Sequence, residues 1–177
     1  SAINPSFALA RAQELVFYLR EGGVKGRLPS PLPVYLDSPR AISATEIFKR
    51  HPECYDVETS ALFGDGHDPF HVPGLQFTRQ ARESMELNEI EGGAIIIAGS
   101  GMCTGGRIRH HLRRHIGRAQ SSVIFDGFAV NGTLAREIID RAESIKIHGE
   151  ELPVSARLHT IGGFPAPPEN GDLFAWH

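Results

Sequence analysis

The chain has 177 residues, 41% of them hydrophobic, and a formal net charge of −3. This length and apolar content allow one sizeable buried core, which excludes a disordered protein and favours a single folded unit. The two cysteines, Cys54 and Cys103, are too few for a disulfide framework and predict a reducing, cytoplasmic setting. No apolar run approaches the roughly 20 residues that a membrane span needs, so we expect a soluble protein without a membrane partner.

The N-terminal residues predict a helix. Asn4 or Ser6 is able to cap a helix that begins near Pro5, and an apolar face continues to the glycine pair at residues 22–23, where the helix is expected to end. The chain therefore opens almost at a helix cap, and residues 171–177 have the pattern of a helix that is cut off early. Both ends predict that the chain is part of a larger protein.

A strand and a second helix are expected next. A proline-rich turn precedes an apolar strand at residues 34–36. Ser38 and Pro39 are the residue types that favour the cap and the first position of a helix, which is expected to end near Arg50. Residues 51–73 show little periodicity and predict an irregular excursion.

Strands and helices then alternate along the rest of the sequence. The expected strands are at residues 75–78, 94–98, 123–128, 145–148 and 154–161, and the expected helices are at residues 81–89 and 133–141 and in the basic segment after residue 106. This alternation predicts an α/β fold in which a mostly parallel sheet has helices on both faces. Ligands of such sheets bind at the carboxyl ends of the strands, where we expect three polar turns to meet, at residues 37–39, 99–106 and 127–133.

The turn at residues 99–106 has the composition of a phosphate-binding loop. It follows an apolar strand and precedes a basic helix, and its four glycines allow the backbone to approach a ligand closely. Five arginines follow, with no acidic residue from Gly105 to Phe125: Arg107, Arg109, Arg113, Arg114 and Arg118. This charge favours a polyanion over a single phosphate group.

Two alternatives bear on this loop. A glycine turn between a strand and a helix also occurs for packing reasons alone, and this explanation stays open. A nucleotide site is not expected, because Thr104 stands where a dinucleotide fingerprint that begins at Gly99 requires glycine, and no Gly-Lys-Ser/Thr follows to make a P-loop.

The sequence contains no evident catalytic or metal-binding group. His111 and His115 have the spacing of two zinc ligands, but two arginines and no general-base glutamate lie between them. His67 and His71 lie in a proline-containing loop without a third ligand and predict exposed loop histidines. We therefore expect no catalytic residue and no metal site in this chain.

Four motifs, in the same order, resemble those of the β-CASP metallo-β-lactamase nucleases, which include bacterial and archaeal RNA-processing enzymes. They lie at residues 34–39, 99–107 with 110–112, 132–134 and 159–164. The resemblance implies a β-CASP domain, an insertion that closes like a lid over a metallo-β-lactamase domain to form an RNA channel. It also implies that two zinc ions of that other domain activate a water molecule for attack on a phosphodiester.

The zinc-ligand motifs of that family do not occur in this sequence, so the resemblance implies no cofactor in this chain and zinc only in the full-length family. Pro167 stands where the family has an active-site histidine, and a further histidine ligand would lie beyond His177. The resemblance assigns residues 1–150 to the β-CASP domain and residues 151–177 to a partial return of the metallo-β-lactamase domain.

We therefore expect an RNA-binding lid domain that is catalytically incomplete by itself. Its expected partners are RNA, bound weakly, and a metallo-β-lactamase domain or a second copy of the chain. The alternative is a protein-interaction or oligomerisation module without an RNA role, which exposed apolar residues after Phe164 would favour. The expected phosphate-binding residues are Asp37, Ser38, Gly99, Ser100, Gly101, Met102, Gly105, Gly106, Arg107, His111, Gly132 and Thr133.

Overall fold

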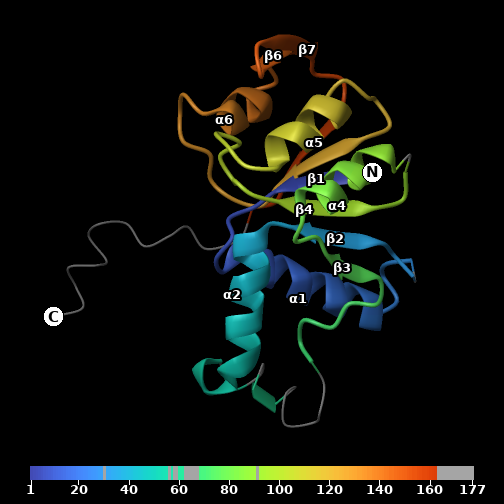
Figure 1. The fold of residues 1–177 in the computed structure, drawn as a ribbon, viewed down its shortest axis with the longest axis vertical. Coiled ribbons are helices and arrows are strands. Elements are labelled where there is room, and N and C mark those ends of the chain that lie inside the picture. The colour runs from blue at the N-terminus through green and yellow to red at the C-terminus, as the bar shows by residue number, and fades with distance from the viewer. Residues whose placement is uncertain (30, 56, 58–59, 62–67, 91, 163–177) are drawn as a thin grey trace, which may run out of the picture.

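A sheet of six parallel strands organises the protein. The computed structural model describes residues 1–29, 31–55, 57, 60–61, 68–90 and 92–162 (Figure 1). The strands of this part of the chain are β1 Ala2–Pro5, β2 Val34–Asp37, β3 Leu75–Phe77, β4 Ile95–Ala98, β5 Ser122–Phe125, β6 Ser144–Ile147, β7 Glu150–Pro153 and β8 Arg157–Thr160. The sheet order is β3-β2-β4-β1-β5-β8, all neighbours are parallel, and β6 and β7 form a separate antiparallel hairpin.

Helices cover both faces of this sheet. They are α1 Arg11–Val24, α2 Pro39–Arg50, α4 Ala81–Glu86, α5 Ile108–His115 and α6 Leu134–Ile139. Figure 1 shows α1 and α2 below the sheet and α5 and α6 above it. None of these helices is long and apolar enough to cross a membrane.

Alternate residues of β4 divide the apolar interior into two cores. Ile96 and Ala98 belong to the core that includes Ile108 of α5, whereas Ile97 belongs to the core that includes Val16 of α1. Successive side chains of a strand point to opposite faces, so a strand that is apolar throughout fills both cores. The predicted α/β class, with a parallel sheet between two layers of helices, is confirmed.

The central strand β1 corrects the first prediction. The sequence predicts a helix from near Pro5, but residues 2–5 pair in parallel with β4, and residues 2–3 also pair in parallel with β5. α1 begins only at Arg11 and continues past the glycine pair. Asn4 and Pro5 are residue types of a helix start, and four residues are too few to show a periodicity. The buried Ile3 and a hydrogen bond of 2.8 Å from Asn4 Nδ2 to a carbonyl oxygen of β5 hold the segment in the sheet.

The prediction for the second helix is confirmed. Ser38 precedes α2, and its Oγ accepts a hydrogen bond from Ala41 N at 3.3 Å. Pro39 occupies the first helical position, where its missing N–H leaves no donor unpaired. In the segment predicted to be irregular, the structure describes a short 3₁₀ turn at Pro52–Cys54.

The C-terminal strands differ from the prediction. The strand expected at residues 154–161 is shorter, and the sequence does not predict β7, because only one of its four residues is shielded from solvent and no apolar alternation marks it. β7 crosses the predicted domain boundary between residues 150 and 151, and β8 follows it, yet they pair with β6 and β5, which precede the boundary. The assignment of residues 151–177 to a second domain stays a prediction, and residues 163–177, with Pro167 among them, lie outside the described residues.

Candidate functional site

The carboxyl ends of the parallel strands bring the three predicted polar turns together. At the end of the glycine turn, Arg107 Nη1 donates to Asp37 Oδ1 at 2.7 Å. On the other side, Val130 N in the third turn donates to Met102 Sδ at 3.4 Å, and Ala135 N donates to Met102 O at 3.2 Å. The turns therefore form one continuous surface at this edge, as the sequence predicts.

The glycine turn is braced on its inner side and open on its outer side. Cys103 is fully buried beneath it, and Ser100 N donates to Gly105 O at 3.2 Å, which closes the turn. At Gly106, where φ is +78°, an added Cβ would lie 2.3 Å from Gly99 O, so glycine is required. At Gly105 an added Cβ would meet no atom within 4 Å, so the outer side is accessible.

Several backbone N–H groups of the turn are available to a ligand. Among residues 100–107, the N–H groups without a hydrogen-bond partner are those of Gly101, Met102, Thr104, Gly106 and Arg107. Unpaired N–H groups just before a helix carry partial positive charge that favours an anion. The turn therefore has the chemistry of a phosphate site, and phosphate binding itself stays a prediction.

Arg107 directs its charge inward. Its guanidinium donates to Asp37 and to two backbone carbonyls, those of Thr78 at 2.9 Å and Arg79 at 2.7 Å. Only 20% of its side chain is exposed. In this conformation Arg107 fixes the start of α5 to the ends of β2 and β3, and the direct phosphate contact that the sequence suggests stays a prediction.

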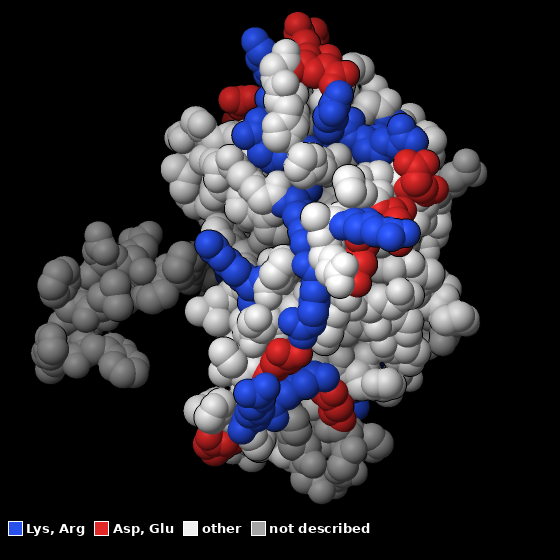
Figure 2. Space-filling view, viewed as in Figure 1, with Lys and Arg blue, Asp and Glu red and all other residues white. Residues whose placement is uncertain are grey.

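Exposed arginines lie on two helices that begin at this edge. Arg113 and Arg114 are exposed on α5, and Arg40 is exposed in the first turn of α2. Arg113 Nε also donates to Glu150 Oε2 at 2.6 Å, which reduces its free charge. Figure 2 shows Lys and Arg side chains in a band down this face of the molecule, with Asp and Glu side chains beside it. A band of this kind attracts polyanions over several ångströms.

Asp37 is the centre of a buried hydrogen-bond cluster. It accepts from Thr78 Oγ1, Ser84 Oγ and His111 Nε2, each at 2.6 Å, and from Arg107. Burial by itself raises the pKa of this carboxyl, but the four donors, led by His111, outweigh burial and lower the pKa to about 2. Asp37 is therefore ionised, and it ties the ends of β2 and β3 to α4 and α5.

His111 shares this buried position. It is fully buried, and its Nδ1 lies 3.2 Å from Asn88 Oδ1. Asp37 and His111 thus meet as the site prediction implies, but under the glycine turn and away from solvent, so their contact with RNA stays a prediction. The sequence does not single out Thr78 or Ser84. Thr78 directly follows β3 and Asp37 ends β2, so both residues lie at strand ends. This position is the sequence signal that could have identified Thr78. No such signal marks Ser84.

The remaining predicted site residues occupy cap and turn positions. Ser38 Oγ lies 3.5 Å from the position that a Cβ of Gly99 would take. Thr133 caps α6 by accepting from Arg136 N at 3.3 Å, and its hydroxyl donates to a backbone carbonyl at 2.6 Å. Gly132 has a φ of +79°. These residues lie at the expected edge, with their hydroxyl groups already engaged in local hydrogen bonds.

A second buried carboxylate, Asp126, is absent from the prediction. It directly follows β5, is 3% exposed, and accepts a long hydrogen bond of 3.4 Å from Ser6 Oγ. Burial dominates its surroundings and raises its pKa to about 6. Its sequence signal is its position within an otherwise apolar run at residues 123–128. A carboxylate in such a run is either buried or marks the end of the strand.

His111 and His115 face different partners and do not converge on one point. The ring nitrogens of His111 face Asp37 and Asn88, whereas His115 Nδ1 lies 3.2 Å from Ser121 Oγ. Burial lowers the pKa of His115 to about 4, so this ring is neutral. The described part of the chain contains no group of three or more His, Cys, Asp and Glu side chains able to hold a metal ion. The described residues therefore do not fit the zinc centre of the full-length family.

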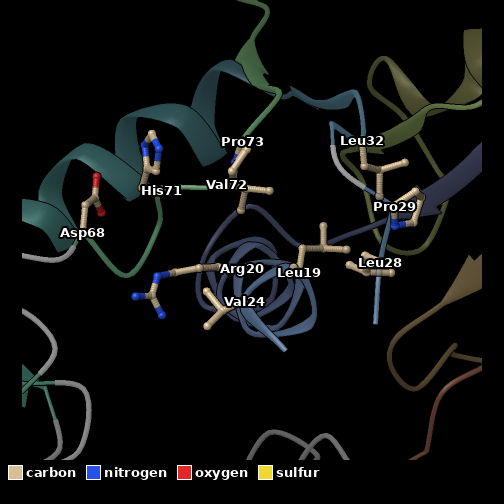
Figure 3. A pocket seen from close by; sticks show the side chains of 11 residues that line it. Leu19, Arg20, Val24, Leu28, Pro29, Leu32, Asp68, His71, Val72 and Pro73 are labelled. Carbon is tan, nitrogen blue, oxygen red and sulfur yellow. The ribbon is translucent and has the colours of Figure 1, made fainter. Parts of the chain in front are cut away.

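A cavity of about 470 Å³ lies at the opposite end of the sheet (Figure 3). Its walls are mainly apolar, with Leu19 and Leu32 among them, and Arg20, Asp68 and His71 lie toward one end. Because the cavity is at the amino ends of β2 and β3, it is separate from the glycine turn. His71 is exposed as predicted, and the other loop histidine lies outside the described residues.

Comparison with known proteins identifies the family. The Beta-Casp domain family matches residues 12–138. The chain is 38% identical over 172 residues to Ribonuclease TTHA0252 of Thermus thermophilus, covering 97% of this chain and 39% of that protein. It is 30% identical over 182 residues to Transcription termination factor FttA of Thermococcus kodakarensis, covering 97% of this chain and 27% of that protein. The chain thus spans less than half the length of these relatives. With its parallel α/β sheet, it belongs to the Beta-Casp domain family.

Proposed function

We propose that this chain is the RNA-binding lid of a zinc-dependent ribonuclease and does not hydrolyse RNA by itself. The observation that carries the proposal is the glycine turn, with its unpaired N–H groups at the carboxyl edge of the sheet, directly before a basic helix. The names of the relatives, a ribonuclease and a transcription termination factor, agree with RNA as the ligand.

An extended polyanion fits this edge better than a single phosphate. The turn is open at Gly105, so the site does not enclose a small ligand. Arg40 in the first turn of α2 adds exposed positive charge at this edge. Arg113 and Arg114 add more in the last turn of α5, where they pair with Glu150 and Glu89. Charges of this kind are able to bind phosphates that follow along one strand.

The same edge carries an apolar surface suited to a second domain. Large hydrophobic side chains are exposed after β1, β5 and β8: Phe7, Leu9, Phe128, Val130 and Ile161. Exposed apolar groups that gather at one edge mark an interaction surface. We propose that a metallo-β-lactamase domain covers this surface, with RNA held between the two domains. The catalytic zinc would belong to that domain, because the described residues here do not fit it.

Both Cys54 and Cys103 are free, which supports the proposed cytoplasmic location.

Fluorescence anisotropy with a short labelled single-stranded RNA tests this proposal. We expect weak binding that falls steeply with salt, with a slope of log affinity against log salt concentration near about −0.7 for each phosphate contact. The absence of binding at low salt would contradict the RNA-lid function for this chain.

A second candidate is a protein-interaction module without an RNA role, which the exposed Phe128 and Leu9, 68% and 67% accessible, favour. Sedimentation velocity separates the two functions. Self-association that Phe128→Ser abolishes, together with no RNA binding, would support the interaction module.

A further inference from the structure

Two imidazole rings from different elements stack on each other beside the glycine turn. His110 lies in the first turn of α5, and His148 lies at the tip of the β6–β7 hairpin. Their ring centroids are 5.0 Å apart and their planes are inclined by 23°. Both residues are exposed. We propose that this histidine pair is a stacking platform for an unpaired nucleobase of the RNA; the proposal rests on the RNA-binding function argued above.

The hairpin turn does not by itself account for a histidine at this position. His148 and Gly149 form a two-residue turn between paired Ile147 and Glu150, with φ values of +52° and +85°. Such a turn favours Asn-Gly most strongly, and it also admits histidine, which is enriched at positive φ among the residues other than glycine. The turn does not need the ring of His148 to lie against a second ring, so the stacking points to a role for the side chain.

The platform is held in place before any ligand arrives. Arg113 Nε of α5 donates to Glu150 Oε2 at 2.6 Å, directly after the turn. Ile145 and Ile147 of β6 are buried in the core that includes α5, and this packing fixes the position of the hairpin relative to α5. A ring pair that is already positioned loses little conformational entropy when a base stacks on it.

The surroundings keep the platform suited to stacking. Burial lowers the pKa of His110, and the neighbouring His148, His111, Arg113 and Arg109 lower it further, so this ring is neutral at neutral pH. Nucleobases of single-stranded RNA stack on histidine and other aromatic rings, and the interaction tolerates any base because each has a π-face.

The platform also lies at a suitable distance from the phosphate site. Arg107, the residue directly after the glycine turn, already has helical backbone angles and lies three residues before His110, which corresponds to about 4.5 Å along a helix axis. A nucleotide whose phosphate occupies the glycine turn therefore has its own or a neighbouring base within reach of the rings.

The test uses the 177-residue chain and a single-stranded RNA that carries one 2-aminopurine, whose fluorescence is quenched by stacking. The variants are His110→Ala and His148→Asn, of which the second keeps a residue suited to the turn and removes the ring. His71→Ala, an exposed histidine at the opposite end of the sheet, is the matched control. We expect each platform variant to weaken RNA binding about fivefold or more and to lose the quenching, and the control to change neither.

Three results would overturn the platform, and they are distinguishable. Binding and quenching that remain unchanged in both platform variants refute the platform alone. An effect that vanishes when EDTA is added assigns the histidines to a bridging metal instead. No RNA binding by the unaltered chain refutes the RNA-binding function, and the platform with it.

Discussion

Arg107 Nη1 lies 2.7 Å from Asp37 Oδ1, and this ion pair joins the residue before α5 to the last residue of β2. The pair sits directly beneath the glycine turn, with the Asp37 side chain completely shielded from solvent. The position of the turn therefore depends on a charge that never reaches the surface.

Replacing that charge should destabilise the domain. We expect Asp37→Asn to lower the free energy of unfolding by about 3 kcal/mol or more, because the substitution leaves buried donors facing an amide without charge. Urea unfolding followed by circular dichroism measures the change. The exposed pair of Arg136 and Asp140 gives the control, since Asp140→Asn should leave the unfolding midpoint unaltered. Equal midpoints for both variants would show that the Asp37 cluster contributes little.

The two adjacent glycines of the turn should respond differently to alanine. Gly106→Ala forces a positive φ on alanine and a clash with Gly99 O, so we expect a loss of about 1 to 3 kcal/mol in the free energy of unfolding. Gly105→Ala meets open space and should change stability by less than about 0.5 kcal/mol. Thermal and urea unfolding of the two variants decide this, and a larger loss at Gly105 would contradict the turn geometry.

Asp126 should make stability depend on pH. Its folded pKa, about 6, lies above its ordinary value of 3.8, so between these pH values the folded state holds more protons and Asp126 lowers stability as pH rises. Asp126→Asn removes this dependence. We expect the variant to gain stability relative to the unaltered chain by up to about 3 kcal/mol from pH 4 to pH 7. His115, with its pKa lowered to about 4, acts in the opposite direction in both proteins and cancels in the comparison. A difference that is independent of pH would contradict the raised pKa.

RNA binding should depend more on Arg107 than on Arg79. Arg107 sets the position of the turn through three hydrogen bonds, whereas Arg79 is half-exposed and paired with Glu46. We therefore expect Arg107→Ala to weaken binding more than Arg79→Ala, measured by anisotropy at a temperature where circular dichroism shows both variants folded. Equal effects would mean that diffuse charge attracts the RNA and that no formed site exists.

The purified chain should contain no stoichiometric zinc and should not cleave labelled RNA when zinc or manganese is added. A catalytic zinc needs about three converging protein ligands and an open position, and His111 and His115 face separate partners. Elemental analysis and a cleavage assay provide the measurements. One zinc per chain, with hydrolysis lost in His111→Ala, would show that the basic helix has been misinterpreted.

Local signals explain what the sequence predicts well. Ser38 and Pro39 are adjacent residues that mark the start of α2. The apolar residues of β4 predict a strand from their own composition, without knowledge of the strands that pair with it. The Asp37 cluster is different, since Asp37 and His111 are 74 residues apart and their contact depends on how β2 and α5 pack. Ser84 joins the cluster only through the placement of α4, which no local pattern encodes.

The position of β1 has a consequence for the order of folding. Asn4 bonds to a residue 120 positions later, and Ile3 pairs with Ile96 and Val123. β1, which comes first in chain order among the strands of this sheet, thus waits for nearly the whole domain before it finds both neighbours. Contacts this distant in sequence slow folding, because loop closure must precede any gain from pairing. Until β1 is in place, β3-β2-β4 and β5-β8 are two half-sheets with unpaired edges, so residues 2–5 decide when the carboxyl edge of the six-stranded sheet becomes continuous.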